Sequence, residues 1–257
     1  MTVPLLHIEH VNKHFGGVIA LNNVSLRIDP GQIYGLIGPN GAGKTTFFNV
    51  MTGLYTADSG TFVLDGQAYT PTSVHKVARA GIARTFQNIR LFNAMSVLEN
   101  VMVGRHIRTQ NGVWAALSRH RRAREEEANT RQIALELLEY VGIAEFANYR
   151  ADSLAYGYQR RLEIARALAT EPRLLALDEP AAGMNSTEKI QLRGLLEKIR
   201  NDGRTLLLIE HDVKLVMGVC DRISVLDYGQ VIAEGIPEEV RRHPAVIKAY
   251  LGAGAHA

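Results

Sequence analysis

A glycine-rich run, residues 38–45, stands between a short apolar segment and a helical pattern. The apolar segment, residues 32–37, predicts a buried strand. After the run, the apolar side chains of residues 47–54 are spaced for the buried face of a helix that ends near Gly53. Glycines at such a junction let successive backbone N–H groups curl around an anion, and the helix N-terminus adds positive potential. The run therefore predicts a strand–loop–helix unit that binds phosphate.

The run fits the pattern G-x-x-x-x-G-K-[ST], which a merely structural glycine turn rarely matches. In this pattern Lys44 reaches the β- and γ-phosphates, and the Thr45 hydroxyl is a ligand for Mg²⁺. We therefore expect a nucleotide to be bound by the loop and the residue after it, namely Gly38, Pro39, Asn40, Gly41, Ala42, Gly43, Lys44, Thr45 and Thr46.

A second motif, LLALDEP at residues 174–180, is an apolar strand that ends in two carboxylates. Ligands of a doubly wound sheet lie at the carboxyl ends of its strands. Asp178 suits the Mg²⁺ shell, and Glu179 can polarise an attacking water. A solvated acidic pair is the alternative, but beside a phosphate loop the catalytic interpretation is favoured.

The pattern of strands and helices changes along the chain. Residues 5–11, 18–28 and 61–64 predict strands, whereas helical periodicity replaces strand signals between about residues 88 and 153. From Gly157 onward, helices (158–169, 186–201) alternate with apolar strands (173–178, 205–210), which indicates a parallel sheet covered by helices. The prediction is an α/β core interrupted by a helical insertion.

Composition excludes several classes. The chain has 257 residues, a formal net charge of +3 and a single cysteine, Cys220. We expect that thiol to be inert near a helix end, and the chain to work in a reducing compartment. The sequence shows neither a secretory signal nor an apolar stretch that could span a bilayer, so a membrane role requires a partner. The basic cluster at residues 119–124 precedes three glutamates, which favours pairing along a helix over a nucleic-acid patch.

Over nearly its whole length the chain resembles the nucleotide-binding subunit of an ABC transporter. The resemblance implies an α/β fold: a P-loop NTPase (RecA-like) core of about residues 1–88 and 158–257, with an N-terminal antiparallel β subdomain and a helical subdomain at about 89–157. It also implies three site residues. Gln87 in RTFQ matches the glutamine that touches Mg²⁺ and reports to the membrane subunit, and His211 matches the histidine that contacts the γ-phosphate. Phe15 matches the aromatic that stacks on adenine, with a core aromatic as the alternative.

Residues 154–161, LAYGYQRR, resemble the family's LSGGQ signature ahead of a helix. Ala155 replaces serine, and Tyr156 and Tyr158 replace glycine and glutamine, while Gly157 is kept. The resemblance implies that Ala155, Tyr156 and Gly157 contact ATP from the opposite subunit of a dimer. Nearby, Asn185 stands where the family usually has aspartate.

Three further stretches, at residues 84–101, 181–185 and 234–252, resemble the ATP-binding subunits of branched-chain amino acid importers, the longer of the two paired types. This implies a peripheral ATPase on the cytoplasmic side of the bacterial inner membrane. Its expected partners are a second ATPase subunit, identical or paired, two permease subunits and indirectly a periplasmic binding protein, without nucleic acid. ATP and Mg²⁺ are the expected cofactors.

Two other classes stay open on the sequence. A non-transport ABC ATPase acting on nucleic acid or ribosomes would usually carry a long coiled-coil insertion or a second cassette. This insertion is about 65 residues without sustained heptads. A GTPase or small-molecule kinase is weakly supported, because Asn12-Lys13 is followed by His14-Phe15 instead of completing an N-K-x-D guanine motif.

Overall fold

The computed structural model describes residues 3–108 and 121–253, and the side chains within them except those of 121–123 and 251–253. The chain forms two compact units. The first combines Met1–Arg84 with Arg173–Ala257, and the second is Thr85–Pro172. We call them the core unit and the helical unit.

A six-stranded sheet in the core unit carries the phosphate loop. Its strand order is β10-β9-β3-β8-β7-β6, and its neighbours run parallel except β10, which is antiparallel to β9. The strands are β3 (Ile33–Ile37), β6 (Ile82–Arg84), β7 (Leu174–Asp178), β8 (Thr205–Ile209), β9 (Arg222–Asp227) and β10 (Gln230–Gly235). Every residue of β3, β7 and β8 is buried, as expected for strands covered on both faces. This confirms the parallel sheet that the apolar runs predict.

A second, four-stranded sheet is antiparallel in the order β2-β1-β4-β5. Its strands are β1 (Leu6–Phe15), β2 (Val18–Ile28), β4 (Ser59–Leu64) and β5 (Gln67–Ala68). From Leu21 to Ile28, β2 largely alternates between buried and exposed side chains, so one face packs on the core while the other meets solvent. The expected N-terminal antiparallel subdomain is confirmed.

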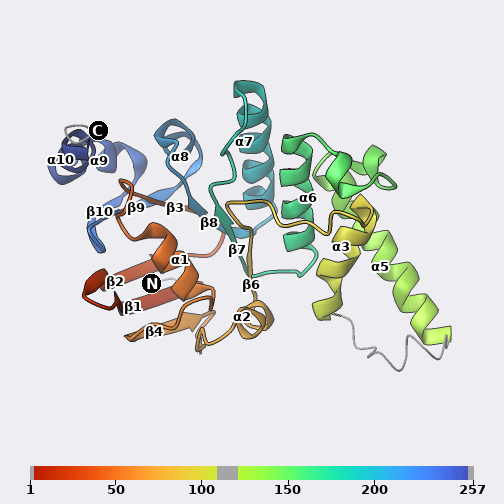
Figure 1. Ribbon diagram of the computed structural model, residues 1–257, viewed down its shortest axis with the longest axis horizontal. Coiled ribbons are helices and arrows are strands. Elements are labelled where there is room, and N and C mark those ends of the chain that lie inside the picture. The colour runs from red at the N-terminus through yellow and green to blue at the C-terminus, as the bar shows by residue number, and fades with distance from the viewer. Residues whose placement is uncertain (1–2, 109–120, 254–257) are drawn as a thin grey trace. The chain divides into compact units, whose positions relative to one another are not determined.

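The helices of the core unit are α1 (Lys44–Met51), α2 (Val74–Ala80), α7 (Ser186–Asn201), α8 (Val213–Val219), α9 (Pro237–Arg242) and α10 (Pro244–Ala253). In Figure 1, α1 lies between the two sheets, while α7 and α8 lie on the other side of the larger sheet. Buried Phe47, Phe48 and Met51 of α1 join side chains of both sheets in one hydrophobic core. The bounds of α7 are those that the sequence predicts.

The helical unit is built from α3 (Val97–Arg105), α5 (Arg121–Tyr140) and α6 (Tyr156–Leu168), with short 3-10 turns at His106–Arg108, Ala144–Phe146 and Ala151–Ser153. Both α5 and α6 pack against α3. A Cβ on Gly104 of α3 would lie 2.3 Å from the Arg166 carbonyl oxygen, so glycine allows α3 and α6 to approach closely. These packing contacts group α6 with the helical unit, whereas the sequence pattern assigns residues from 158 onward to the core.

Several elements escape the sequence pattern, namely β6, α2, the β9–β10 hairpin and the helices after β10. Within residues 3–108 and 121–253, no helix is both long and apolar enough to cross a membrane. Arg119 of the basic cluster lies outside the described residues, as do the side chains of Arg121 and Arg122.

Candidate nucleotide site

The phosphate loop follows β3 and opens α1 directly. Its glycines at 38, 41 and 43 have φ of 156°, 79° and 101°, a region that L side chains rarely adopt. A Cβ on Gly38 would lie 2.1 Å from the Leu226 carbonyl oxygen, and one on Gly43 would lie 2.7 Å from that of Ala20. Since Gly43 occupies the N-cap of α1 without a side chain, the first N–H groups of the helix are left for an anion.

Lys44 lies inside this loop. Its side chain is buried, and its Nζ donates to the carbonyl oxygens of Gly38 and Pro39, at 2.8 and 2.9 Å. Burial lowers the pKa of the Lys44 amine, while Glu179 and Asp178 act in the opposite direction. The two carboxylates are therefore close enough to act on the ammonium group. Thr45 is exposed and Thr46 is half-buried beside it.

Asp178 and Glu179 lie at the carboxyl end of β7, as predicted. Asp178 is buried, and Arg84 Nη2 lies 3.9 Å from its Oδ2. Arg84 is itself held by hydrogen bonds to Asn49 (3.1 Å) and Thr52 (2.6 Å) and lies over the Phe48 ring. This arginine, which the sequence analysis did not single out, places a held positive charge beside the buried carboxylate.

Glu179 is held in a strained backbone conformation with φ of 45°, and its N–H donates to the Ile209 carbonyl at 2.8 Å. Its Oε2 lies 3.5 Å from Nδ1 of His211, whose side chain is 59% exposed. A carboxylate and an imidazole thus share one solvent-accessible edge of the sheet. The sequence predicts separate roles for these two residues, and the structure places their side chains next to each other.

Glu210 is a second site residue that the sequence analysis did not single out. It is fully buried, and its carboxylate accepts hydrogen bonds from the N–H groups of Ala181 (2.8 Å), His211 (3.2 Å) and Asp212 (3.4 Å). Burial raises the pKa of the Glu210 carboxyl. The carboxylate ties the turn after Glu179 to the turn that carries His211. A charged residue ending an otherwise apolar strand was the available signal.

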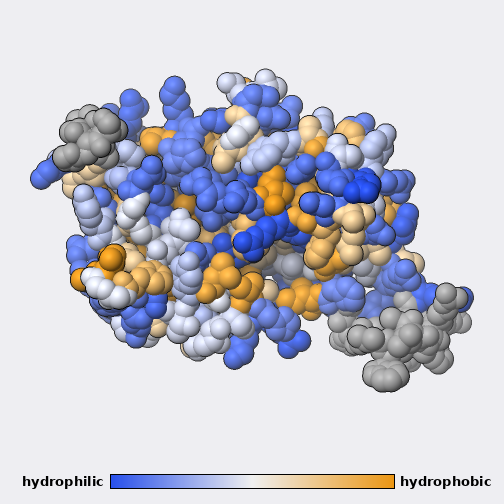
Figure 2. Space-filling view, viewed as in Figure 1, coloured by the Kyte–Doolittle hydropathy of each residue, from blue (hydrophilic) through white to orange (hydrophobic). Residues whose placement is uncertain are grey.

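Phe15 lies at the exposed turn between β1 and β2. Its side chain is 45% exposed and meets the Tyr55 ring edge-on at 5.3 Å, with the Lys13 amine 5.2 Å from its centroid. Figure 2 shows hydrophobic atoms gathered over this end of the four-stranded sheet. The exposed ring therefore does not belong to the core.

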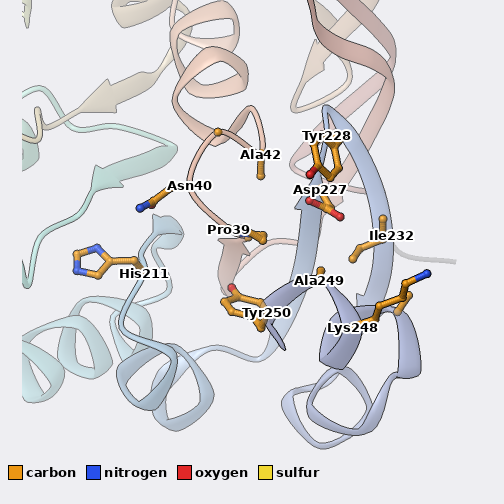
Figure 3. A pocket seen from close by; sticks show the side chains of 13 residues that line it. Pro39, Asn40, Ala42, His211, Asp227, Tyr228, Ile232, Lys248, Ala249 and Tyr250 are labelled. Atoms are coloured by element: carbon orange, nitrogen blue, oxygen red, sulfur yellow. The ribbon is translucent and has the colours of Figure 1, made fainter. Parts of the chain in front are cut away.

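A cavity of about 900 Å³ borders the phosphate loop in the core unit. In Figure 3, Pro39 and Tyr250 lie between His211 on one side and Asp227 with Ile232 on the other. Helix α10 supplies Ala245, Lys248, Ala249 and Tyr250 to the lining. The C-terminal segment therefore lies beside the loop that the sequence assigns to phosphate.

Gln87 and the signature-like segment lie in the helical unit. Ala155 is the N-cap of α6, Tyr156 and Gly157 begin the helix, and the Tyr156 side chain is exposed whereas Gly157 is buried. The methyl group of Ala155 cannot accept a hydrogen bond, so it cannot cap the helix as serine would. Arg160 of α6 donates to the Gln87 carbonyl at 2.8 Å. The structure thus brings Gln87 and the signature together within one unit.

Asn185 has a local explanation in the core unit. It is the N-cap of α7, where its side chain accepts from the Glu188 N–H at 3.0 Å while Glu188 accepts from the Asn185 N–H at 2.9 Å. Asparagine and aspartate are comparable caps, so the departure from the family pattern leaves the start of α7 intact.

Comparison with known proteins decides the family. Residues 21–182 match the family model described as ABC transporter, and residues 230–256 match that of the branched-chain amino acid ATP-binding cassette transporter. The chain belongs to the ABC transporter family. A high-affinity branched-chain amino acid transport ATP-binding protein of Pseudomonas aeruginosa, BraF, is 47% identical over 253 residues, 98% of this chain and 99% of BraF. The expected resemblance is confirmed, and the protein is an ABC ATPase.

Solved ABC cassettes share the fold. The ADP conformation of MJ1267, an ATP-binding cassette of an ABC transporter, aligns with a TM-score of 0.84 and 31% identity over 98% of this chain and 100% of that one. MJ0796, bound to ADP and Pi in a dimeric post-hydrolysis state, aligns with a TM-score of 0.76 and 26% identity over 90% and 98%. ABC cassettes of this fold therefore dimerise.

The donors at this ABC site fit Mg²⁺. Among the described residues, His, Cys, Asp and Glu do not gather in any group of three that could hold a metal ion by itself. Mg²⁺ does not need such a group, because it binds through one or two carboxylates together with substrate phosphates and water. A buried carboxylate at Asp178 and an exposed hydroxyl at Thr45 are donors of the required kind.

Cys220 behaves as expected. It is the C-cap of α8 and is buried. Its Sγ packs against Gly35 of β3, where an added Cβ would lie only 3.0 Å from the sulfur. Burial raises the pKa of the Cys220 thiol, so the nucleophilic thiolate is disfavoured.

Proposed function

We propose that this ABC ATPase powers an importer for branched-chain or other hydrophobic amino acids. The observation that carries the proposal is the joint presence of the phosphate loop, the Glu179–His211 pair and a C-terminal segment, residues 230–256, of the branched-chain amino acid type. BraF, which matches over nearly its entire length, is a branched-chain amino acid transport protein.

In the proposed reaction, the loop N–H groups and Lys44 bind the β- and γ-phosphates, and Phe15 stacks on adenine. Glu179 polarises the attacking water. His211, whose Nδ1 lies 3.5 Å from Glu179 Oε2, contacts the γ-phosphate. Thr45, Asp178 and Gln87 would hold Mg²⁺, which supplies charge neutralisation on the phosphates when bound. Positioning and electrostatics dominate such chemistry, which is why a rigid, buried frame around Asp178 matters.

We place the ATP between two subunits, with Ala155, Tyr156 and Gly157 of one facing the phosphate loop of the other. The second subunit is another copy or a paired ATPase, and closure of the pair on ATP moves two permease subunits. A periplasmic binding protein delivers the amino acid. The chain then acts as a peripheral subunit on the cytoplasmic face of the bacterial inner membrane.

The helical unit offers a surface for the permease. Phe92, Met95 and Tyr149 are 46%, 39% and 56% exposed. Their segments are joined by backbone hydrogen bonds from Val97 to Tyr149 and from Ala151 to Met95, at 2.9 and 3.0 Å. An apolar patch held on a rigid backbone suits a short permease helix. Phe92 and Met95 of this patch follow Gln87 closely in the sequence, which supports a link between nucleotide state and transport.

The test is transport by the assembled complex. The chain, its two permease subunits and a paired ATPase are placed in liposomes with binding protein outside and ATP inside. We expect ATP-dependent uptake of leucine, isoleucine or valine, abolished by Glu179→Gln but retained by Glu197→Gln, a matched change at a surface ion pair with Arg193. Salt-sensitive duplex DNA binding without any amino acid uptake would instead support the non-transport alternative.

A further inference from the structure

Arg160 of α6 is the largest fully buried side chain of the described residues. Its guanidinium faces Glu163, one turn along the helix, with Nη1 2.6 Å from Oε2, and both side chains are almost completely excluded from solvent. An ion pair this deeply buried is a costly way to hold a helix, because both charges lose their hydration.

The Arg160–Glu163 pair forms hydrogen bonds to the backbone of Phe86 and Gln87, the segment that we call the Gln87 loop. Nη1 of Arg160 also donates to the Phe86 carbonyl at 2.6 Å, and Nη2 donates to the Gln87 carbonyl at 2.8 Å. Glu163 accepts from the Phe86 N–H at 3.2 Å. Three successive peptide units, from Thr85–Phe86 to Gln87–Asn88, are thus held by a planar fork and a carboxylate together. That geometry suits arginine and not lysine, whose ammonium is a point charge.

The same guanidinium reaches the signature. Nη2 of Arg160 is 3.2 Å from the Tyr156 hydroxyl, and its centre lies 5.9 Å from the Tyr156 ring. Tyr156 is the residue that replaces a signature glycine, and its side chain is 41% exposed. A glycine at this position could not make the contact. The departure from the family pattern therefore adds a side-chain bond between signature and Gln87 loop.

We propose that Arg160 is a positioning residue that joins the Gln87 loop to Tyr156, so that the two ATP sites of the dimer influence each other. The inference rests on the proposed function, in which Gln87 serves the ATP held by its own phosphate loop while Tyr156 serves the ATP held by the partner. ATP bound at one site then shifts the Gln87 loop, and Arg160 bonds this loop to Tyr156, which contacts the ATP at the other site. Coupling of this kind is a shared free energy between two sites.

The first test measures the link itself. Amide hydrogen exchange of Phe86 is followed by NMR in the wild type, in Arg160→Lys, and in the matched control Arg161→Lys, whose arginine donates to the Val141 carbonyl instead. The Phe86 N–H donates to Glu163, and Arg160 holds both that carboxylate and the Phe86 and Gln87 carbonyls. Because Arg160→Lys loosens these partners, we expect the Phe86 amide to exchange about tenfold faster or more. Unchanged exchange in Arg160→Lys, or equal acceleration in Arg161→Lys, would overturn the link.

The second test measures coupling in the assembled complex, as hydrolysis rate against MgATP concentration. We expect a wild-type Hill coefficient between 1 and 2, the limit for two sites, falling toward 1 in Arg160→Lys and in Tyr156→Phe. Tyr156→Phe removes only a hydroxyl and leaves the Arg160–Glu163 pair in place. Arg161→Lys should retain the wild-type coefficient.

The outcomes are separable. A wild-type complex that neither hydrolyses ATP nor takes up amino acid contradicts the proposed function, while the exchange result at Phe86 still judges the link. An active wild-type complex with a Hill coefficient of 1, or variants with an unchanged coefficient, overturns the coupling alone.

Discussion

The phosphate loop and the signature segment both precede a helix, yet they are built in opposite ways. The loop uses its backbone: its three glycines have positive φ, and Gly38 and Gly43 approach the backbone of Leu226 and Ala20. The signature keeps one glycine, Gly157, and otherwise presents Ala155 and two tyrosines. A backbone site tolerates little substitution because a Cβ would collide, whereas a side-chain site can be rebuilt with other side chains.

Buried glutamates show the same contrast. Glu210 of the core unit is satisfied by three backbone N–H groups, while Glu163 of the helical unit is paired with Arg160. Both carboxyls have raised pKa values because of burial. Glu210 is thus held by main-chain hydrogen bonds, whereas Glu163 combines one main-chain hydrogen bond with a side-chain ion pair. The predictions below test how far this contrast extends to function.

The largest effect is expected for Glu179→Gln. Glutamine keeps the size of the side chain but cannot polarise water as a carboxylate does, so turnover should fall by roughly 10²–10⁴-fold while ATP affinity stays within about threefold. Rates of phosphate release and equilibrium binding of a fluorescent ATP analogue measure the two quantities. Normal turnover in this variant would mean that another group activates the water.

The buried glutamates should differ in what their loss costs. Glu163→Gln leaves Arg160 buried without its counter-charge, at about 3–5 kcal/mol. Glu210→Gln disturbs hydrogen bonds to backbone N–H groups, at about 1–3 kcal/mol. Urea denaturation at pH 7 measures both. A smaller loss for Glu163→Gln than for Glu210→Gln would contradict the contrast between the two units.

The pH dependence of Glu210→Gln sharpens this result. Because the folded state raises the Glu210 pKa above its ordinary value of 4.5, the folded protein binds that proton more tightly than the unfolded chain. The contribution of Glu210 to stability is complete below that ordinary value and is lost as pH rises through the raised pKa. The wild type should therefore lose stability relative to Glu210→Gln as the pH rises above 4.5. A difference that stays constant with pH would show that Glu210 is not the titrating group.

Lys44→Ala should weaken ATP binding by about 10–100-fold, the loss of a charged hydrogen bond to phosphate. Removal of the amine also takes away one donor from the Gly38 carbonyl and one from the Pro39 carbonyl. Equilibrium binding of ATP measures the loss, with the exposed Lys198→Ala of α7 as the control. Equal affinity in both variants would show that the loop N–H groups hold the phosphates without the lysine.

Sequence patterns located the core site because its chemistry is tied to strand ends. The apolar runs before Asp178 and before Glu210 could be read directly, and parallel strands bring their carboxyl ends together. Arg84 and Arg160 could not be found in this way. Arg84 contacts Asp178 and Arg160 contacts the Gln87 loop, and both partners are distant in the sequence. The hydrophobic periodicity around each arginine does not predict that its charge is buried. Helix α6 likewise joined the helical unit through packing against α3, which periodicity does not encode.

The smallest effect concerns the altered signature, tested by Ala155→Ser in a Glu179→Gln background. Ala155 is the N-cap of α6, so a serine there gains two contacts at once. Its oxygen accepts from the first turn of the helix, worth about 0.5–2 kcal/mol without nucleotide, and its hydroxyl donates to the γ-phosphate across the dimer, worth about 1.5–3 kcal/mol. Thermal denaturation without ATP measures the first contribution, and the dimer dissociation constant with and without ATP measures the second. We expect about tenfold or greater tightening of the ATP-bound dimer, beyond any change without ATP. Helix stabilisation with no gain in ATP-dependent association would show that Tyr156 and the backbone N–H groups already satisfy the phosphate, and that the signature has been rebuilt from other side chains without loss.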